Sequence, residues 1–533
     1  MGVRTNRDTG VKANWKVILM CLGMSLANFQ YGYDTATIAG FQAMPGFLKV
    51  YGYRDKKTKI GWNIATGPQQ LMTSFLNVGT IIGVLLTHVW AKKFGRRQGV
   101  WLACVLSWVA AGLQIGTDKL VGLYFGRIIL GISNGFFITF ANVWVAEVTP
   151  AHLRGPVVSF FGIWSSTGSI IGATANNETK DFTSRLAYQI PLATLFAIPL
   201  FLGTLVAFLP ESPRWLLVHG RGEEAKRSLR KLRGSSFKGD EELLEEEFVE
   251  MQNGIEKELE QVNGSVVKDM FKGTDLRRTL ICFGVILSHS SGGLWLIIGY
   301  GTFFFQQAGV DKPFLATILK SVLGLAGVLT SIFLNYRIIG RRFSMLLGHA
   351  GSALCMLGMG IAGSTSSDPS ASGKAVLACA LLYYFVYNGF SGAVSWPVAN
   401  ELVSSRLRVV TIGLGTGVNY VFAWLTSFTT PYFINPKELN WGAKVAYIWA
   451  ASNAITFVYF YFFLPEMRGR TLEEIDELFI NKVPRRDFPT YHCVSSERAR
   501  EQAIKNIDGG ASVGEVHVAD EKRVNEQKKD NVV

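Results

Sequence analysis

Two charged residues, Asp34 and Arg127, lie inside apolar stretches that are long enough to cross a bilayer. A charge near the middle of such a stretch costs about 2.5–3.5 kcal/mol on insertion scales, so it normally faces a protein interior or a water-filled path. At about 1.5 Å of rise per helical residue, the depths of the two side chains are compatible. An aspartate that is partly desolvated beside an arginine can exchange protonation for ion pairing. The sequence therefore predicts that Asp34 and Arg127 act together, and a static ion pair is the alternative.

Glutamates and arginines also stand at the ends of apolar stretches, in a pattern that occurs twice. Glu147 is followed by Arg154 and Glu401 by Arg408, with the same step both times (154 − 147 and 408 − 401). Ion pairs between such side chains can hold one end of a helix bundle closed and must break when it opens, which makes a two-state element. Orientation by basic loops would explain the arginines but not the matched glutamates. The predicted cytoplasmic gate consists of Arg96, Arg97, Glu147, Arg154, Glu211, Arg214, Arg341, Arg342, Glu401 and Arg408.

The elements that must position these charges are apolar helices. Hydrophobic residues make up 49% of the 533 residues and charged residues only 17%, against about 25% in globular proteins. The apolar blocks are about 18–25 residues long, the length that spans hydrocarbon, and they lack the period-two alternation of a β-barrel. We therefore expect an all-α, polytopic membrane protein in a lipid bilayer, with twelve transmembrane helices. The expected spans are residues 15–40, 71–90, 98–116, 126–155, 156–176, 188–209, 279–304, 314–336, 344–363, 375–398, 409–430 and 444–464.

An internal repeat divides the chain into two related halves. The Gly-Arg-Arg run at residues 95–97 recurs at 340–342, an offset of 245 residues (340 − 95), and the Pro-Glu pair at 210–211 recurs at 465–466, an offset of 255 (465 − 210). Ordered matches at a nearly constant offset predict two six-helix bundles, and parallel repeats suit alternating access with a substrate site between them. The expected segments are an N-terminal segment (1–14), a first bundle (15–209), a helical linker (210–277), a second bundle (278–464) and a tail (465–533), disordered beyond about Arg486.

Charge and motif content bound the function further. The net charge is +13, but the excess basic residues lie mostly in short connectors and tails, so we read them as orienting the helices with both termini cytoplasmic, and we expect no nucleic-acid partner. The six cysteines have no framework spacing, which favours free thiols. We find no nucleotide-binding loop, Cys/His metal cluster or nucleophile–base motif, and therefore expect no enzyme activity, cofactor or metal.

Several motifs together resemble those of the sugar porter family of the major facilitator superfamily. The sequence Tyr-Gly-Tyr-Asp-Thr at residues 31–35 and the long tail resemble those of fungal members of that family. The resemblance covers about residues 15–480. It implies the major facilitator fold and sugar transport in the plasma membrane. The motifs are Gly-Arg-Arg at 95–97, Arg127 to Gly131, Glu147 to Arg154-Gly155, Pro-Glu-Ser-Pro-Arg-Trp at 210–215, Gly392 with Trp396 and Glu401, and Pro-Glu-Met-Arg-Gly-Arg-Thr-Leu-Glu-Glu at 465–474.

The resemblance also assigns a role to the buried charges. In proton-coupled members that this chain resembles, an aspartate in the Gly-Tyr-Asp context is the proton site. We therefore expect H⁺ symport, with Asp34 as the proton carrier and Arg127 as its partner.

The sugar site departs from the pattern of hexose porters. Gly162 stands where many of them have a glutamine, and His289-Ser290 stands where they have a Gln-Gln pair. The segment at residues 290–304 is more similar to fungal α-glucoside carriers, and the small Gly162 would leave room for a larger ligand. Sugars bind to aromatic faces and hydrogen-bonding side chains, although tryptophan and tyrosine also pack helices. The expected substrate-binding residues are His289, Ser290, Trp295, Tyr300, Gly392, Trp396 and Asn419.

Other functions stay open on the sequence alone. A facilitator would move sugars or polyols without proton coupling, and a transporter-like nutrient sensor would signal through the long tail. An organic-acid carrier is also compatible, because one fold hosts several ligands. The sequence names neither the sugar nor the oligomeric state.

Overall fold

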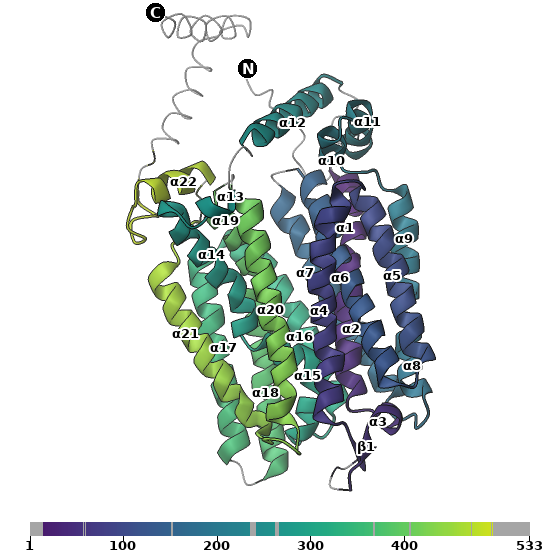
Figure 1. Ribbon diagram of the computed structural model, residues 1–533. Helices are drawn as coiled ribbons and strands as arrows, with labels where there is room; N and C mark the ends of the chain where they lie inside the picture. The colour runs from purple at the N-terminus through teal and green to yellow at the C-terminus, as the bar shows by residue number, and fades with distance from the viewer. Residues whose placement is uncertain are drawn as a thin grey trace, which may run out of the picture.

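The structure of the protein is a computed structural model that describes residues 14–493, apart from 57, 59, 151–152, 235–240, 262–265, 366–367, 405–406, 469, 471 and 492. Long helices run side by side in two groups, with short helices at one end (Figure 1). The first set comprises α1 (Trp15–Ser25), α2 (Ala27–Phe41), α3 (Pro45–Tyr51), α4 (Thr66–Ala91), α5 (Arg96–Gly116), α6 (Leu120–Val148), α7 (Arg154–Thr179), α8 (Leu186–Thr194) and α9 (Ala197–Phe208), with strands β1 (Tyr53–Arg54) and β2 (Trp62–Asn63).

A linker and a second set of helices follow. The linker holds α10 (Pro213–Val218), α11 (Gly222–Arg233), α12 (Glu241–Gln261) and α13 (Val266–Asp269). The second set comprises α14 (Gly273–Ser291), α15 (Leu294–Gln307), α16 (Pro313–Arg337), α17 (Arg341–Thr365), α18 (Pro369–Val386), the π-helical turn η2 (Tyr387–Gly392), α19 (Ala393–Leu402), α20 (Arg408–Ile434), the 3₁₀ turn η3 (Gly442–Val445) and α21 (Ala446–Phe463). Helix α22 (Leu472–Ile480) lies in the C-terminal segment.

Among the described residues, ten helical stretches are long and apolar enough to cross a membrane. Two of the twelve expected spans are not among these ten. The first span is divided at Leu26 into α1 and α2, which are individually short. The eleventh, α20, is a continuous helix of 27 residues. Both nevertheless pack along the other long helices.

The same helix pairings occur in both sets. In the first set α2 packs on α7, α4 on α6 and α5 on α9, and in the second set α14 packs on α20, α16 on α18 and α17 on α21. Between the sets, α2 contacts α15, α4 contacts α20 and α7 contacts α16. Figure 1 shows α4 and α20 side by side along this boundary.

Glycines allow the closest helix crossings in the first set. A Cβ placed on Gly131 of α6 would lie 2.8 Å from the Cα of Gly79 and 2.9 Å from the Thr80 nitrogen on α4. A Cβ on Gly79 would in turn lie 2.9 Å from the Cα of Gly131. Small residues permit such backbone contact between membrane helices, where dispersion rather than hydrophobic burial drives association.

The two ends of the molecule differ. The linker end carries α10, α11 and α12, and the opposite, hairpin end carries α3 and the antiparallel pair β1–β2 (Figure 1). We expected disorder beyond about Arg486, and the structure differs there. Phe488 and Cys493 are buried, and Arg470 donates hydrogen bonds to the carbonyls of Phe488, Pro489 and Tyr491. The rest of that tail prediction, residues 494–533, lies outside the described residues.

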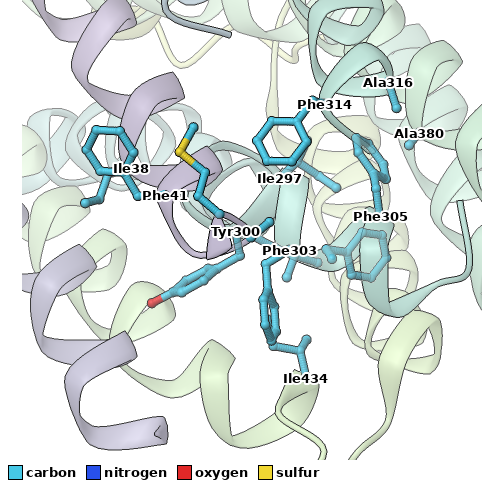
Figure 2. Packing of buried hydrophobic residues seen from close by; sticks show 14 of the residues in the cluster. Ile38, Phe41, Ile297, Tyr300, Phe303, Phe305, Phe314, Ala316, Ala380 and Ile434 are labelled. Atoms are coloured by element: carbon cyan, nitrogen blue, oxygen red, sulfur yellow. The ribbon is translucent and has the colours of Figure 1, made fainter. Parts of the chain in front are cut away.

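An apolar cluster joins the two sets toward the hairpin end. Ile38 and Phe41 of α2 belong to the same buried cluster as Tyr300 and Phe303 of α15. Figure 2 shows these side chains together with Phe314, Ala316, Ala380 and Ile434 from the other helices of the second set.

Polar side chains extend this contact between the sets. The Gln42 side-chain N–H donates to the Gly299 carbonyl (3.0 Å), and Asn435 donates to the Gln69 amide oxygen (3.2 Å). Asn77 donates to the Ser427 hydroxyl (3.0 Å). We call these three bonds and the apolar cluster the hairpin-end seal, because they close the boundary between the sets on that side.

Candidate functional site

The Asp34–Arg127 pair lies in the interior of the first set. The Arg127 guanidinium (Nη1) is 2.6 Å from the Asp34 carboxylate (Oδ1), and each side chain is only 1% exposed. Arg127 also donates from Nε to the Met72 carbonyl at 3.0 Å. Asp34 lies on α2, which contacts α15 of the second set, and Arg127 lies on α6. The ion pair therefore links a helix at the boundary between the sets to another helix of the first set.

The pair leaves one polar atom unused on each partner. The Oδ2 of Asp34 and the Nη2 of Arg127 are buried and have no hydrogen-bond partner. A bidentate fork would have satisfied both atoms, as arginine–carboxylate pairs commonly do. Unsatisfied atoms of a buried ion pair are costly and call for an explanation, such as a catalytic role or a bound water.

Three side chains of the second set meet around His289. Its Nδ1 is 2.8 Å from the Tyr387 hydroxyl, its Nε2 is 2.6 Å from the Ser395 hydroxyl, and its ring centroid is 5.5 Å from that of Trp396. One ring nitrogen of a neutral histidine donates and the other accepts. His289 and Trp396 are only half-buried, so their faces remain available to a ligand.

The π-helical turn η2 positions Tyr387 and Ser395, two of the partners of His289. Residues 387–392 form a π-helical turn between α18 and α19, and this turn begins at Tyr387 and ends at Gly392. A Cβ on Gly392 would lie 2.9 Å from the Tyr387 ring. Single π-turns in membrane and soluble helices frequently mark functional sites.

The other expected binding residues lie nearby on α14, α15 and α20. Ser290 donates to the Asn419 side-chain oxygen at 2.8 Å. The Trp295 ring is 8% exposed, and its indole N–H is buried without a partner. Tyr300 donates to the Ser427 carbonyl, so its hydroxyl is already used. The structure thus brings together His289 with Trp396 and Ser290 with Asn419, whereas Tyr300 packs in the hairpin-end seal.

Three tyrosines that we did not expect complete this region. Tyr31 of the first set lies near Tyr384, Tyr387 and Tyr420 of the second set and near Asp34. Tyr31, Tyr384 and Tyr420 are half-buried. We call His289, Trp396 and the four tyrosines 31, 384, 387 and 420 the central polar cluster. This cluster was hard to predict from the sequence, because each tyrosine stands in an apolar span where ring packing is the ordinary role.

Two gate ion pairs form at the linker end, one in each set. The Arg96 guanidinium donates two hydrogen bonds to the Glu147 carboxylate, of 2.8 and 3.1 Å. The Arg341 guanidinium donates two to the Glu401 carboxylate, of 3.1 and 3.3 Å. The two pairs occupy equivalent places in the repeat. Each pair joins helices of its own set, so the geometry differs from a gate in which the sets pair with each other.

A second contact that occurs in both sets joins each Gly-Arg-Arg turn to a glutamate that follows the last long helix of the set. The Glu211 carboxylate accepts the backbone N–H groups of Arg96 (3.1 Å) and Arg97 (3.2 Å), and Glu466 accepts those of Arg341 (3.0 Å) and Arg342 (3.1 Å). Negative charge at a helix N-terminus is favourable. Burial raises the pKa of Glu211 above its ordinary value, and the N–H donors and Arg97 oppose that rise.

The glycine before each arginine pair has a physical reason. A Cβ on Gly95 would collide with the Glu211 carboxylate, and one on Gly340 would collide with that of Glu466. We predicted Glu211 as a gate residue but not Glu466. The repeat of the Pro-Glu pair at residues 465–466 indicated that Glu466 occupies the equivalent position.

The remaining gate residues take other positions. Arg97 donates to the carbonyls of Val206 and Ala207 at the end of α9, and Arg342 donates to the Tyr461 carbonyl on α21. Arg408 begins α20 and donates to Val403, and Arg214 is half-buried in the first turn of α10. The side chain of Arg154, the first residue of α7, lies outside the described part of the structure.

We expect replacement of Glu466 by alanine to destabilise the protein. Two N–H groups at the start of α17 would lose their acceptor, and an unmade buried hydrogen bond costs about 1–3 kcal/mol. Thermal unfolding of purified protein should show a lower midpoint for Glu466→Ala and likewise for Glu211→Ala. Glu224→Ala is the control, because Glu224 pairs with Arg221 on the surface. An unchanged midpoint in Glu466→Ala would show that these bonds add nothing to stability.

No group of three or more His, Cys, Asp or Glu side chains that could hold a metal occurs among the described residues. All six cysteines are free.

Comparison with known proteins agrees with this architecture. The family model for "Sugar (and other) transporter" matches residues 20–479. Hexose transporter 2 of Kluyveromyces lactis is 29% identical over 480 residues, which are 87% of this chain and 82% of that protein. The general alpha-glucoside permease of Saccharomyces cerevisiae is 31% identical over 484 residues, 89% of this chain and 77% of that protein.

A solved structure gives the fold independently. The proton:xylose symporter XylE, bound to 6-bromo-6-deoxy-D-glucose, aligns with a TM-score of 0.70 and 22% identity over 87% of this chain and 100% of that one. The expected all-α major facilitator fold and the resemblance to fungal sugar porters are confirmed. The relatives are transporters and not enzymes. The protein therefore has the major facilitator fold and is a member of the sugar (and other) transporter family.

Proposed function

We propose that this protein imports a sugar together with H⁺ across the plasma membrane by alternating access. The observation that carries the proposal is the buried Asp34–Arg127 pair with one unused atom on each partner. The free Oδ2 of Asp34 can accept a proton, which would weaken its attraction to Arg127. A carboxylate that gains or loses an ion-pair partner changes its proton affinity, so pairing and protonation are linked.

Alternating access needs a boundary that opens at one end while it closes at the other. The hairpin-end seal supports this, because it joins α2 to α15 and α4 to α20 by a few hydrogen bonds and apolar contacts. Asp34 lies in α2, four residues before Ile38 of that seal (38 − 34). A change of charge at Asp34 can therefore bias the same helix that closes the boundary.

The central polar cluster is the proposed sugar site. It combines an aromatic face, Trp396, with hydrogen-bonding groups on both sets, including Tyr31 and His289. Aromatic rings with a few convergent polar groups are the usual composition of small-molecule sites. The relatives named for hexoses and alpha-glucosides support a sugar as the ligand.

The orientation follows from the basic residues at the linker end. Lys92 and Lys93 are exposed there, beside the linker, which also carries Arg221 just before α11 and Arg230 within α11. Basic residues in short connectors favour the cytoplasmic side. We therefore assign the linker end and both termini to the cytoplasm, and the hairpin end to the outside.

The test is uptake in cells that lack their own sugar carriers. We expect accumulation above the external concentration, a rise of external pH when substrate is added, and collapse of accumulation by a protonophore. Uptake that stops at equilibrium without a pH change would make the protein an uncoupled facilitator and overturn proton coupling. If the protein reaches the cell surface and moves no sugar or sugar acid, it is a sensor and the transport proposal fails.

A further inference from the structure

A buried lysine lies beside the central polar cluster. Lys320 on α16 is 2% exposed. Its Nζ stands 4.8 Å from the centre of the Tyr384 ring, and Tyr384 belongs to the central polar cluster. A lysine inside a membrane-spanning helix is expensive, and such residues mark substrate or ion pathways.

The described residues provide Lys320 with no carboxylate. No hydrogen bond or ion pair of its Nζ occurs within the described part of the chain, so the ring of Tyr384 is its one charge-stabilising contact there. Asp34, a buried acid of the first set, is already paired with Arg127. A cation–π contact is worth about 0.5–2 kcal/mol, which falls short of the cost of burying an ammonium group.

The neighbours of the amine are small or carry hydroxyl groups. Gly301 on α15 faces Lys320, and a Cβ at that glycine would lie 3.8 Å from Nζ. Hydroxyl groups flank the site: Thr302 and Thr317 are 2.9 Å apart, and Ser321 is 2.9 Å from Ser169 of the first set. The amine therefore lies at the boundary between the sets, where a substrate would bind.

We propose that Lys320 binds a carboxylate of the substrate, so that the transported ligand is a sugar acid, a uronate or aldonate, rather than a neutral sugar. The inference rests on the proposed function, because it names the substrate class of the same site. A neutral sugar would leave the ammonium group unpaired in the occluded state. A carboxylate would neutralise it with a charge-assisted hydrogen bond, which is about twice as strong as a neutral one.

The probe is a matched pair of ligands, D-glucuronate and D-glucose, which differ only in the carboxylate at C6. In cells that lack their own carriers for either ligand, the wild type should take up labelled glucuronate. Lys320→Met should lose about 10–100-fold of that uptake, since a hydrogen bond to a charged group is worth about 1.5–3 kcal/mol. Lys320→Arg should keep most of it. Lys312→Met, which alters an exposed lysine at the start of the same helix, is the control for expression and folding.

A measurement on the unaltered protein covers the case in which Lys320→Met fails to fold. Glucuronate should raise the thermal unfolding midpoint of the purified wild type, and glucose at the same concentration should raise it less. Uptake of glucose with no uptake of glucuronate would overturn the sugar-acid proposal and leave the proposed transport function intact. Equal glucuronate uptake by wild type and Lys320→Met would also overturn it. Uptake of neither ligand, nor of any other sugar or sugar acid, would overturn the proposed function itself.

Discussion

Asp34→Asn is expected to abolish accumulation of substrate against its gradient. Asparagine keeps the size of the side chain but can neither take up a proton nor carry a negative charge, so the step that links H⁺ movement to the change of conformation is lost. We expect the accumulation ratio to fall from well above one to about one, because proton coupling is the only energy source in this scheme. The measurement is the steady-state ratio of internal to external substrate in carrier-deficient cells.

Downhill exchange separates coupling from folding in this variant. Asp34→Asn should still exchange labelled for unlabelled substrate across the membrane, because exchange needs no net proton movement. Asp118→Asn is the matched control: Asp118 pairs with Arg185 on the exposed surface at the hairpin end, with more than half of each side chain accessible. Full accumulation in Asp34→Asn would assign the Asp34–Arg127 pair a purely structural role.

Gly131→Ala is expected to destabilise the first set strongly. The added methyl group would press on the Leu76 carbonyl and on the Cα of Gly79, which are backbone atoms that cannot rotate away. Overpacking of a tight core typically costs about 1–3 kcal/mol, and contact with backbone lies at the upper end or above it. The thermal midpoint of detergent-solubilised protein should drop, and Gly131→Leu should yield no monodisperse protein.

Gly417→Ala is the matched control for this substitution. Gly417 lies in the middle of α20, and a Cβ there would meet no atom within 4 Å. The exchange of a helical glycine for alanine in open space is worth about 0.5–1 kcal/mol in favour of the folded state. Its midpoint should therefore stay or rise. A similar midpoint for Gly131→Ala would mean that α4 and α6 can separate without cost.

Features that the sequence repeats were predictable. The Gly-Arg-Arg runs and the matched glutamates indicated that each set would hold the same polar contacts, and Arg96–Glu147 and Arg341–Glu401 are such a pair of contacts. Contact between Asp34 and Arg127 was predictable because the two charges lie at compatible depths in apolar spans, where each side chain gains from an opposite charge. The long apolar runs likewise specified their helices, since a bilayer leaves the backbone no other way to satisfy its hydrogen bonds.

Features that depend on the exact register or rotation of a helix could not be predicted from the sequence. The π-turn at residues 387–392 shifts the faces of Tyr387 and Ser395 relative to an unbroken helix, so no count of residues along the span could place them on His289. We predicted no role for Lys320 from the sequence, because a single lysine near the start of a span commonly extends its charge to the membrane–water interface. The placement of Phe488, Pro489 and Tyr491 depends on Arg470, whose bonds to their carbonyls leave no periodic signal in the sequence.

The composition of the hairpin-end seal has a consequence for the medium in which the protein works. Its inner bonds join amides and a hydroxyl, Gln42 to Gly299, Gln69 to Asn435 and Asn77 to Ser427, and none of these groups carries a net charge. Dissolved ions screen charges and leave uncharged dipoles nearly untouched. These inner bonds should therefore keep nearly the same strength in fresh water and in brine, whereas salt should weaken the contact of Glu438 with Thr66 and of Lys437 with the Tyr53 ring at the same end, and the Arg–Glu pairs at the linker end.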